Sequence, residues 1–243
     1  MKLFLIAGEA SGDRLGAALM AGLRYLRPDI TFSGIGGPMM QAEGLESLFP
    51  MEELSVMGIA EVLPKYFHLK RRIREAAAAA LAEAPAALVT IDSPDFCLRV
   101  AKLVKVARPG LCTIHYVAPS VWAWRPGRAA RMARVIDHVL ALLPFEPPYM
   151  TAAGMSCDFV GHPVVAEALA TPDAVAAFRA RGTAPLLLTL PGSRRGEVSR
   201  LAPVFGGVIA QLKAAHPGLR VVLPTVRGVS GLVRDLTADW PVA

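Results

Sequence analysis

The sequence predicts an α/β fold: a doubly wound parallel sheet, followed by the start of a second α/β domain. Short apolar runs alternate with longer helical patterns along the 243 residues. The runs lack polar alternation, which indicates strands that are buried on both faces, as in a parallel sheet. Their alternation with helices indicates βαβ units with right-handed crossovers. Both domains are therefore expected to be Rossmann-like.

The expected elements follow the apolar runs in order. The predicted strands are Lys2–Ala7, Ile30–Gly34, Ala87–Ile91, Cys112–Val117, His138–Leu142 and Asp158–Val160, and then Pro185–Leu190 and Arg220–Leu223. The predicted helices are Gly12–Leu26, Lys70–Ala82, Phe96–Ala107, Arg128–Val135 and Glu197–Ala215.

A boundary between two domains is expected near residue 168. The Ala-rich stretch Val164–Arg181, with prolines at positions 163 and 172, separates the two series of elements. We assign 1–168 to an N-terminal domain and 169–243 to the start of a C-terminal domain. The second part has only about 75 residues, roughly half of an ordinary domain of this type. The chain is therefore expected to be incomplete at its C-terminal end.

Composition narrows the function classes. Hydrophobic residues make up 53% of the chain, yet no apolar stretch reaches the 18 or so residues that a spanning helix needs. Glu9 and Asp13 interrupt the apolar N-terminus, so we expect no signal peptide and a cytoplasmic location. The net charge of +6 suits nucleic acid, an anionic membrane or phosphorylated substrates. Cys97, Cys112 and Cys157 have no metal-binding spacing, and we expect buried thiols.

A glycine loop follows the first predicted strand. Gly8, Glu9, Ser11, Gly12 and Asp13 come between this strand and the first helix. Glycines let the backbone approach a ligand, and ligands of open α/β sheets bind at the carboxyl ends of strands. The two acids argue against simple pyrophosphate binding. Two interpretations remain: a site that faces substrate, or a turn in which Ser11 and Asp13 cap the helix.

Two carboxylates follow the strand Ala87–Ile91. Pro94 can begin the next helix, and Asp95 then has a structural role beside the helix N-terminus. Asp92 has no such role, and a carboxylate there can take a proton from an attacking hydroxyl. Asp92 is therefore the stronger catalytic candidate, with Asp95 as a weaker candidate for substrate binding.

An aromatic segment runs from His115 to Arg125. Trp122 and Trp124, followed by arginines at 125, 128, 131 and 134, could stack on a sugar and bind a phosphate. The alternative is a core-packing loop followed by a solvated basic helix face.

A second glycine loop repeats the strand–loop–helix arrangement. Gly192, Ser193, Arg194, Arg195 and Glu197 lie at the start of the last long helix. Free N–H groups and two arginines favour a diphosphate. The loop lacks the Walker pattern.

One stretch combines apolar, aromatic and basic residues, as interfacial segments do. The candidate membrane-docking residues are Ile59, Val62, Leu63, Tyr66, Phe67, Leu69, Lys70, Arg71 and Arg72. The alternative is an amphipathic helix whose apolar side meets the core.

Taken together, these motifs resemble the lipid-A-disaccharide synthases. The matching segments are Gly8–Asp13, Gly36–Met40, Met51–Leu54 with Val56–Gly58, Ile91–Phe96, His115–Arg125, Leu143–Glu146, Phe159–Pro163 and Leu190–Arg194. They occur in the family's order over nearly the whole chain. The resemblance implies a two-domain glycosyltransferase of the GT-B type, of which this chain lacks the C-terminal part.

The resemblance also implies the reaction. UDP-2,3-diacylglucosamine would react with 2,3-diacylglucosamine 1-phosphate to give the β-1,6-linked disaccharide and UDP. The anomeric carbon would be inverted, and neither a metal nor a cofactor would be needed. Asp92 matches the family's candidate base, Arg194 its essential arginine, and residues 59–69 its membrane-docking helix. Ser120 and His162 lie in matching motifs and are further candidates for substrate binding.

The expected partners are lipid-linked sugars and the cytoplasmic face of the inner membrane, with the protein bound peripherally. Association into a homo-oligomer is left open. Two other functions remain: a related GT-B enzyme or sugar-nucleotide epimerase, and an inactive lipid-binding fragment. A nucleic-acid partner is not expected, because the cations gather around two loops and one apolar segment.

Overall fold

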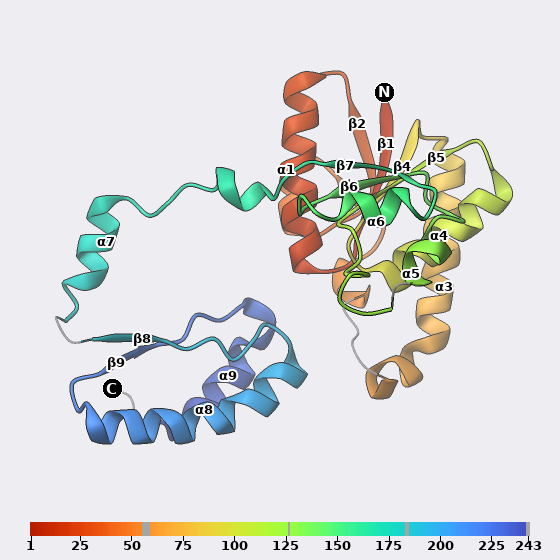
Figure 1. The fold of residues 1–243 in the computed structure, drawn as a ribbon. Helices are drawn as coiled ribbons and strands as arrows, with labels where there is room; N and C mark the ends of the chain where they lie inside the picture. The colour runs from red at the N-terminus through yellow and green to blue at the C-terminus, as the bar shows by residue number, and fades with distance from the viewer. Residues whose placement is uncertain (55–58, 126, 183–184, 242–243) are drawn as a thin grey trace. The chain divides into compact units, whose positions relative to one another are not determined.

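The computed structural model describes residues 1–54, 59–125, 127–182 and 185–241, with the backbone alone for 59–65 and 227. The chain divides into two compact units, Met1–Glu167 and Ala168–Ala243 (Figure 1). Each unit is an α/β structure, which confirms the expected fold class.

The first unit is built on a seven-stranded sheet in the order β3-β2-β1-β4-β5-β6-β7. Every neighbouring pair is parallel. The strands are β1 (Lys2–Ala7), β2 (Thr31–Ile35), β3 (Glu46–Ser47), β4 (Ala87–Ile91), β5 (Cys112–Tyr116), β6 (His138–Ala141) and β7 (Ser156–Phe159). The inner strands β1 and β4 are buried over almost their whole length, as their continuous apolar sequences predict.

Helices connect the strands of this sheet. They are α1 (Ala10–Leu26), α2 (Pro38–Ala42), η1 (Met51–Leu54), α3 (Ile59–Glu83), α4 (Pro94–Ala107), α5 (Gly127–Met132), α6 (Pro147–Thr151) and η2 (Pro163–Ala166). Figure 1 shows α1 on one side of the sheet and α3 with α4 on the other. Alanines at 76, 77 and 80 are buried on α3, where small side chains allow close packing.

The second unit is smaller. It contains α7 (Pro172–Arg179), β8 (Leu186–Leu188), α8 (Arg195–Ala215), β9 (Arg220–Val222), η3 (Arg227–Val229) and α9 (Ser230–Thr237). Its two strands are parallel. A small cluster of Val198, Val229 and Val233 forms a core, whereas Leu186, Leu188 and other apolar side chains are exposed.

The predicted long elements agree with the structure to within a few residues, with one exception. Helix α3 begins at Ile59 and continues through Pro64, whereas the sequence predicted a start at Lys70. The short elements α2, β3, α6 and α7 were not predicted. Elements of two to eight residues are too short for a periodic pattern, and packing against neighbours stabilises them.

Candidate active site

The order of the strands reverses between β1 and β4. Strands β2 and β3 lie on one side of this pair, and β5, β6 and β7 lie on the other. Ala7 and Ile91 are register partners at the carboxyl ends of β1 and β4. The loops that follow them therefore leave the sheet side by side, at the kind of switch point where α/β proteins bind ligands.

Two glycines bring the first loop against the end of β4. A Cβ atom on Gly8 would lie 2.7 Å from Ser93 Oγ, and one on Gly12 would lie 3.3 Å from the backbone oxygen of Ile91. Larger residues would push the loops apart. The glycines therefore hold the loop at this distance from Asp92 and Ser93, which is a role in geometry in addition to any contact with substrate.

Asp92 lies at the centre of this edge. The Ser11 hydroxyl donates a hydrogen bond to Asp92 Oδ2 at 3.3 Å. The backbone N–H of Asp92 donates to the Tyr116 carbonyl of the next strand at 3.0 Å. Asp92 and Ser93 both have left-handed backbone, with φ of 51° and 43°. Such residues carry backbone strain, which is common at functional sites.

Asp13 has a different role from the one expected. Its carboxylate is buried and accepts hydrogen bonds from the backbone N–H groups of Gly37, Met39 and Met40 at 2.9, 3.0 and 2.9 Å. Asp13 therefore caps the start of α2 and not its own helix. Both of its carboxylate oxygens already accept backbone N–H groups. Glu9 is the N-cap residue of α1 and is half-buried beside Gly8.

Asp95 lies in the first turn of α4, as expected for a helix start. Its side chain is 93% exposed, and Arg128 Nη2 lies 3.2 Å from its Oδ1. Arg128 comes from α5, so this ion pair joins two neighbouring helices. The structure does not bring the Asp95 carboxylate into hydrogen-bonding distance of Asp92.

Beneath the edge lies a buried imidazole that the sequence did not single out as a site residue. His115 Nδ1 lies 2.7 Å from the Thr90 hydroxyl, which also contacts the Ile114 carbonyl. Burial, together with the charge of Arg128, lowers the pKa of His115 to about 4. His115 is therefore neutral near pH 7. The sequence placed His115 in a predicted strand and at the start of a motif that matches the family, but gave it no role of its own.

The aromatic segment follows β5 and is largely exposed. Trp122 meets Phe145 edge to face, with ring centroids 5.2 Å apart. Arg125 lies over the ring of Trp124 at 4.2 Å. The carbonyl of Ser120 accepts the N–H groups of Ala123 and Trp124, which forms a tight turn. The predicted core-packing alternative does not describe the two indoles, because both are exposed.

His162 lies at the end of the first unit. Its Nδ1 accepts the backbone N–H of Val164 at 3.1 Å and so caps η2. The side chain is exposed, and this contact with Val164 is local. The structure thus assigns His162 a capping role and leaves its role toward substrate as a prediction.

The candidate membrane-docking segment falls on α3. The side chains of Ile59, Val62 and Leu63 lie outside the described residues. Tyr66 and Phe67 are exposed and touch edge to face, with centroids 5.5 Å apart, and Phe67 is 81% exposed. Lys70 and Arg71 are exposed as well.

Two of the candidate membrane-docking residues, Leu69 and Arg72, contact other parts of the first unit. Leu69 packs against the core. Arg72 binds both carboxylate oxygens of Glu53 at 2.7 Å and lies over the ring of Phe49. These hydrogen bonds from Arg72 lower the pKa of Glu53. Arg72 therefore fixes α3 to η1, and the exposed part of the segment is the face that carries Tyr66, Phe67 and Lys70.

The second glycine loop is closed by Glu197. Its carboxylate accepts the backbone N–H groups of Ser193 and Arg194 at 3.2 and 3.3 Å, and Arg194 Nη1 lies 3.1 Å from it. Gly192 has φ of +114°, and a Cβ there would lie 2.6 Å from the same carboxylate. The hydrogen bond from Arg194 lowers the pKa of Glu197. Arg195 begins α8 and is exposed. An anion would have to compete with Glu197 for these N–H groups.

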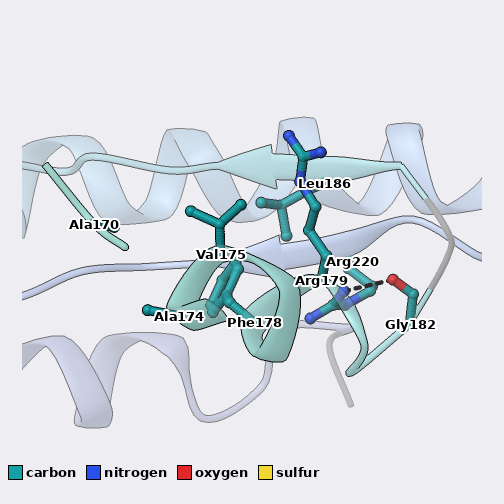
Figure 2. Close-up of a pocket in the computed structure, with 8 residues that line it drawn as sticks. All are labelled: Ala170, Ala174, Val175, Phe178, Arg179, Gly182, Leu186 and Arg220. Atoms are coloured by element: carbon teal, nitrogen blue, oxygen red, sulfur yellow. Dashed lines mark hydrogen bonds between the residues drawn. The ribbon is translucent and has the colours of Figure 1, made fainter. Parts of the chain in front are cut away.

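A cavity of about 790 Å³ lies elsewhere in the second unit (Figure 2). It is lined by Ala170, Ala174, Val175, Phe178, Arg179, Gly182, Leu186 and Arg220. Arg220 donates a hydrogen bond to the Gly182 carbonyl at 2.8 Å, drawn as a dashed line in Figure 2. The cavity is at the amino-terminal ends of β8 and β9, whereas the Gly192 loop follows the carboxyl end of β8. We therefore assign it no part in the site.

Metal-binding clusters and membrane-spanning helices are both absent from the described residues. In residues that the structure describes, three or more His, Cys, Asp or Glu side chains do not come together as a metal site. Within the same part of the chain, every helix is too short or too polar to cross a bilayer. Of the three cysteines expected to be buried, only Cys97 is, and burial raises the pKa of its thiol well above the usual value. The expectation was wrong for Cys112, which is exposed, and for Cys157, which is only partly buried.

Comparison with known proteins agrees with this arrangement of motifs. The profile of the lipid-A-disaccharide synthetase family matches residues 3–231. The chain belongs to this family. A lipid-A-disaccharide synthase of Ruegeria pomeroyi is 65% identical over 246 residues, which cover 100% of this chain and 61% of that protein. One from Rhodospirillum centenum is 50% identical over 99% of this chain and 61% of that protein. The chain thus spans about three-fifths of the length of these lipid-A-disaccharide synthases.

Solved structures support the fold. A UDP-GlcNAc 2-epimerase from Neisseria meningitidis, bound to UDP-GlcNAc, aligns with a TM-score of 0.66 and 11% identity, over 99% of this chain and 70% of that one. The enzyme from Methanocaldococcus jannaschii aligns with a TM-score of 0.59 and 15% identity, over 99% and 69%. At such low sequence identities the similarity concerns the fold alone. The fold of this member of the lipid-A-disaccharide synthetase family is GT-B-like.

Proposed function

We propose that this chain is the acceptor-binding and base-carrying part of a glycosyltransferase that joins two acylated glucosamine units. The donor would be UDP-2,3-diacylglucosamine and the acceptor 2,3-diacylglucosamine 1-phosphate, with inversion at the anomeric carbon. Membership of the lipid-A-disaccharide synthetase family supports these substrates. The observation that carries the proposal is the position of Asp92 at the switch point, on strained backbone and within hydrogen-bonding distance of Ser11.

In this proposal, Asp92 is the general base. It is half-buried at the carboxyl edge of β4, where a ligand in the crevice would reach it. It takes the proton from the acceptor 6-hydroxyl as that oxygen attacks the anomeric carbon. The Ser11 hydroxyl holds the carboxylate in one orientation. Gly8, Glu9 and Gly12 form the wall beside it.

Arg194, in the second unit, is the candidate for binding the leaving diphosphate. The diphosphate of UDP leaves with developing negative charge, and a guanidinium together with backbone N–H groups stabilises such an anion. Ser193 and Arg194 supply the N–H groups, and Arg195 adds a second charge at the start of α8. Glu197 keeps the loop ordered through its hydrogen bonds before the diphosphate binds.

The face of α3 that carries Tyr66, Phe67, Lys70 and Arg71 would hold the protein at the cytoplasmic surface of the inner membrane. Its aromatic rings are exposed beside cations, the combination that interfacial segments use. A lipid-linked substrate could then reach the site from the bilayer. Trp122, Trp124 and Arg125 would contact that substrate.

The test is a transfer assay on this chain and on a full-length version of it, in detergent. Disaccharide 1-phosphate and UDP are measured by mass spectrometry, with Asp92→Asn as the control for background. The expected result is product from the full-length protein and product formed about 10²–10⁴-fold more slowly by its Asp92→Asn variant. Absence of product from the full-length protein would overturn the proposed substrates. Epimerised UDP-sugar in its place would favour the epimerase alternative.

A further inference from the structure

Six exposed apolar side chains gather at one edge of the first sheet. We call them the aromatic edge: Trp122, Trp124, Leu143, Phe145, Phe159 and Val160. Phe159 ends β7 and Val160 follows it, Leu143 and Phe145 lie in the segment after β6, and Trp122 and Trp124 lie six and eight residues after β5. The three strands are neighbours and parallel (Figure 1). Each of the six side chains is between 38% and 55% exposed. Exposed apolar surfaces of this kind commonly mark binding sites.

The backbone and one ring pair hold this edge in place. The N–H of Val117 donates to the Leu140 carbonyl at 3.0 Å, and that of Val160 donates to the Ala141 carbonyl at 2.9 Å. The Trp122–Phe145 contact joins the loop after β5 to the loop after β6. The Trp122 and Phe145 rings are therefore positioned before any ligand arrives, which lowers the entropic cost of binding.

Positive charge borders the aromatic edge. Arg125 lies over the ring of Trp124 at 4.2 Å and is exposed. Two nearby acids are already engaged: Asp95 pairs with Arg128, and Glu146 is buried and accepts the N–H of Leu143. Apolar surface beside cations complements a ligand with a hydrocarbon part and an anionic part.

The width of the edge favours a hydrocarbon chain over a sugar ring. Three neighbouring strands span about 10 Å. A sugar stacks on one ring face and needs polar partners around it, whereas the Trp124 ring already carries Arg125. An acyl chain can cross several apolar side chains and needs no hydrogen bonds.

We propose that the aromatic edge binds an acyl chain of the phosphorylated, lipid-linked acceptor, with Arg125 beside its phosphate. The inference rests on the proposed function, because that function supplies an acceptor that is both acylated and phosphorylated.

The chain carries its own reporters for a test. Its three tryptophans are Trp122, Trp124 and Trp240, and the last lies in the second unit against Gly206 of α8. In a Trp240→Phe variant only the two indoles of the aromatic edge emit. The probe is dodecyl phosphate brominated at its terminal carbons, added below its micelle concentration, because bromine quenches indole emission at short range. The matched uncharged probe is the corresponding brominated dodecyl glucoside.

The expected result is saturable quenching of the Trp240→Phe chain by the phosphate probe, and about tenfold weaker binding of the uncharged probe. Arg125→Gln should weaken binding of the phosphate probe by about tenfold as well. Phe145→Ser should weaken both probes. Tyr25→Ser removes an exposed aromatic ring near the end of α1, away from the aromatic edge, and should leave binding unchanged. Circular dichroism confirms that each variant is folded.

Three results would overturn the inference. One is an absence of saturable quenching in the Trp240→Phe chain. The second is equal quenching of a Trp122→Phe/Trp124→Phe chain, in which Trp240 alone emits. The third is quenching that disappears as protein concentration rises, which would show that a second copy covers this edge. The quenching experiment measures probe binding and does not depend on sugar transfer. If the full-length protein transfers sugar but the Trp240→Phe chain shows no quenching, only this inference is overturned. If the probe quenches but no sugar is transferred, only the proposed function is overturned.

Discussion

The carboxylate of Asp13 accepts a hydrogen bond from the backbone N–H of Gly37 at 2.9 Å, although 24 residues separate the two in sequence. Met39 and Met40 donate to the same carboxylate. Asp13 is only 3% exposed. One buried anion thus joins helix α1 to the start of α2 and fixes the loop that follows β2.

Replacing this carboxylate should destabilise the protein. Asp13→Asn keeps the shape but places an amide N–H₂ group where an oxygen accepted backbone N–H groups. We expect the free energy of unfolding to fall by about 3 kcal/mol, since hydrogen bonds to a charged group are worth about 1.5–3 kcal/mol each. Urea unfolding measures the loss. Asp29→Asn, at an exposed carboxylate, is the control and should cost less than about 0.5 kcal/mol. Equal effects of the two changes would contradict this role of Asp13.

Two glycines of α1 should respond in opposite directions to alanine. A Cβ on Gly16 would lie 2.4 Å from the Sδ atom of the buried Met40, whereas a Cβ on Gly22 meets no atom within 4 Å. Gly16→Ala should destabilise the protein by about 1–3 kcal/mol through overpacking. Gly22→Ala should stabilise it by about 0.5–1 kcal/mol through helix propensity. Thermal unfolding of both variants checks the pair, and a stable Gly16→Ala variant would show that Met40 can move aside.

Asp92 and Asp95 should differ in their effect on transfer. In the full-length protein, Asp92→Asn should lower kcat by about 10²–10⁴-fold, the usual contribution of a general base. Asp95→Asn is the matched control: its exposed carboxylate contacts Arg128, and its loss should change kcat by less than about threefold. Steady-state kinetics separate the two. Similar losses in both variants would remove Asp92 from its role as base.

Ser11 should act through Asp92. Ser11→Ala removes one hydrogen bond to the carboxylate and should lower kcat by about fivefold, in keeping with about 1 kcal/mol for such a bond. Ser11→Thr keeps the hydroxyl and should restore most of the rate. The alanine change should have no further effect in an Asp92→Asn background. An additive loss there would mean that Ser11 contacts substrate independently of Asp92.

His115 should make stability depend on pH. The pKa of His115 is about 4 in the folded protein, compared with about 6.5 in an unfolded chain. As pH falls below 6.5, the unfolded chain takes up a proton that the folded protein does not, so folding stability decreases. The decrease should reach about 3 kcal/mol by pH 4. Urea unfolding of wild type and His115→Gln between pH 7 and pH 4 should show this difference between their pH profiles.

His216→Gln provides the matched control, because His216 is an exposed imidazole at the end of α8. Parallel profiles for wild type and His115→Gln would show that the buried imidazole does not contribute to acid destabilisation.

Much of the fold could be predicted from the sequence. Apolar runs such as Lys2–Ala7 and Ala87–Ile91 have the length and continuity of strands that are buried on both faces, and the structure confirms both without change of bounds. The motif series also indicated the family, which the comparisons confirm. Asp92 stood out because an acid ended an apolar strand. Each of these signals lies within a short segment, where neighbouring residues are the relevant environment.

The roles of individual polar side chains were decided only in three dimensions. Glycine-loop acids look alike in sequence, yet Asp13 is buried against backbone N–H groups from α2, and Glu197 closes its own loop. Arg72 resembled its basic neighbours on α3 but binds Glu53. Phe145 meets Trp122 from a loop 23 positions away. The sequence alone determined the long strands and helices, in their order along the chain, and the family motifs, because these depend on local apolar periodicity and spacing. Only the tertiary structure decided which carboxylates and arginines remain free for a ligand, because partners distant in the sequence meet only after the sheet has formed.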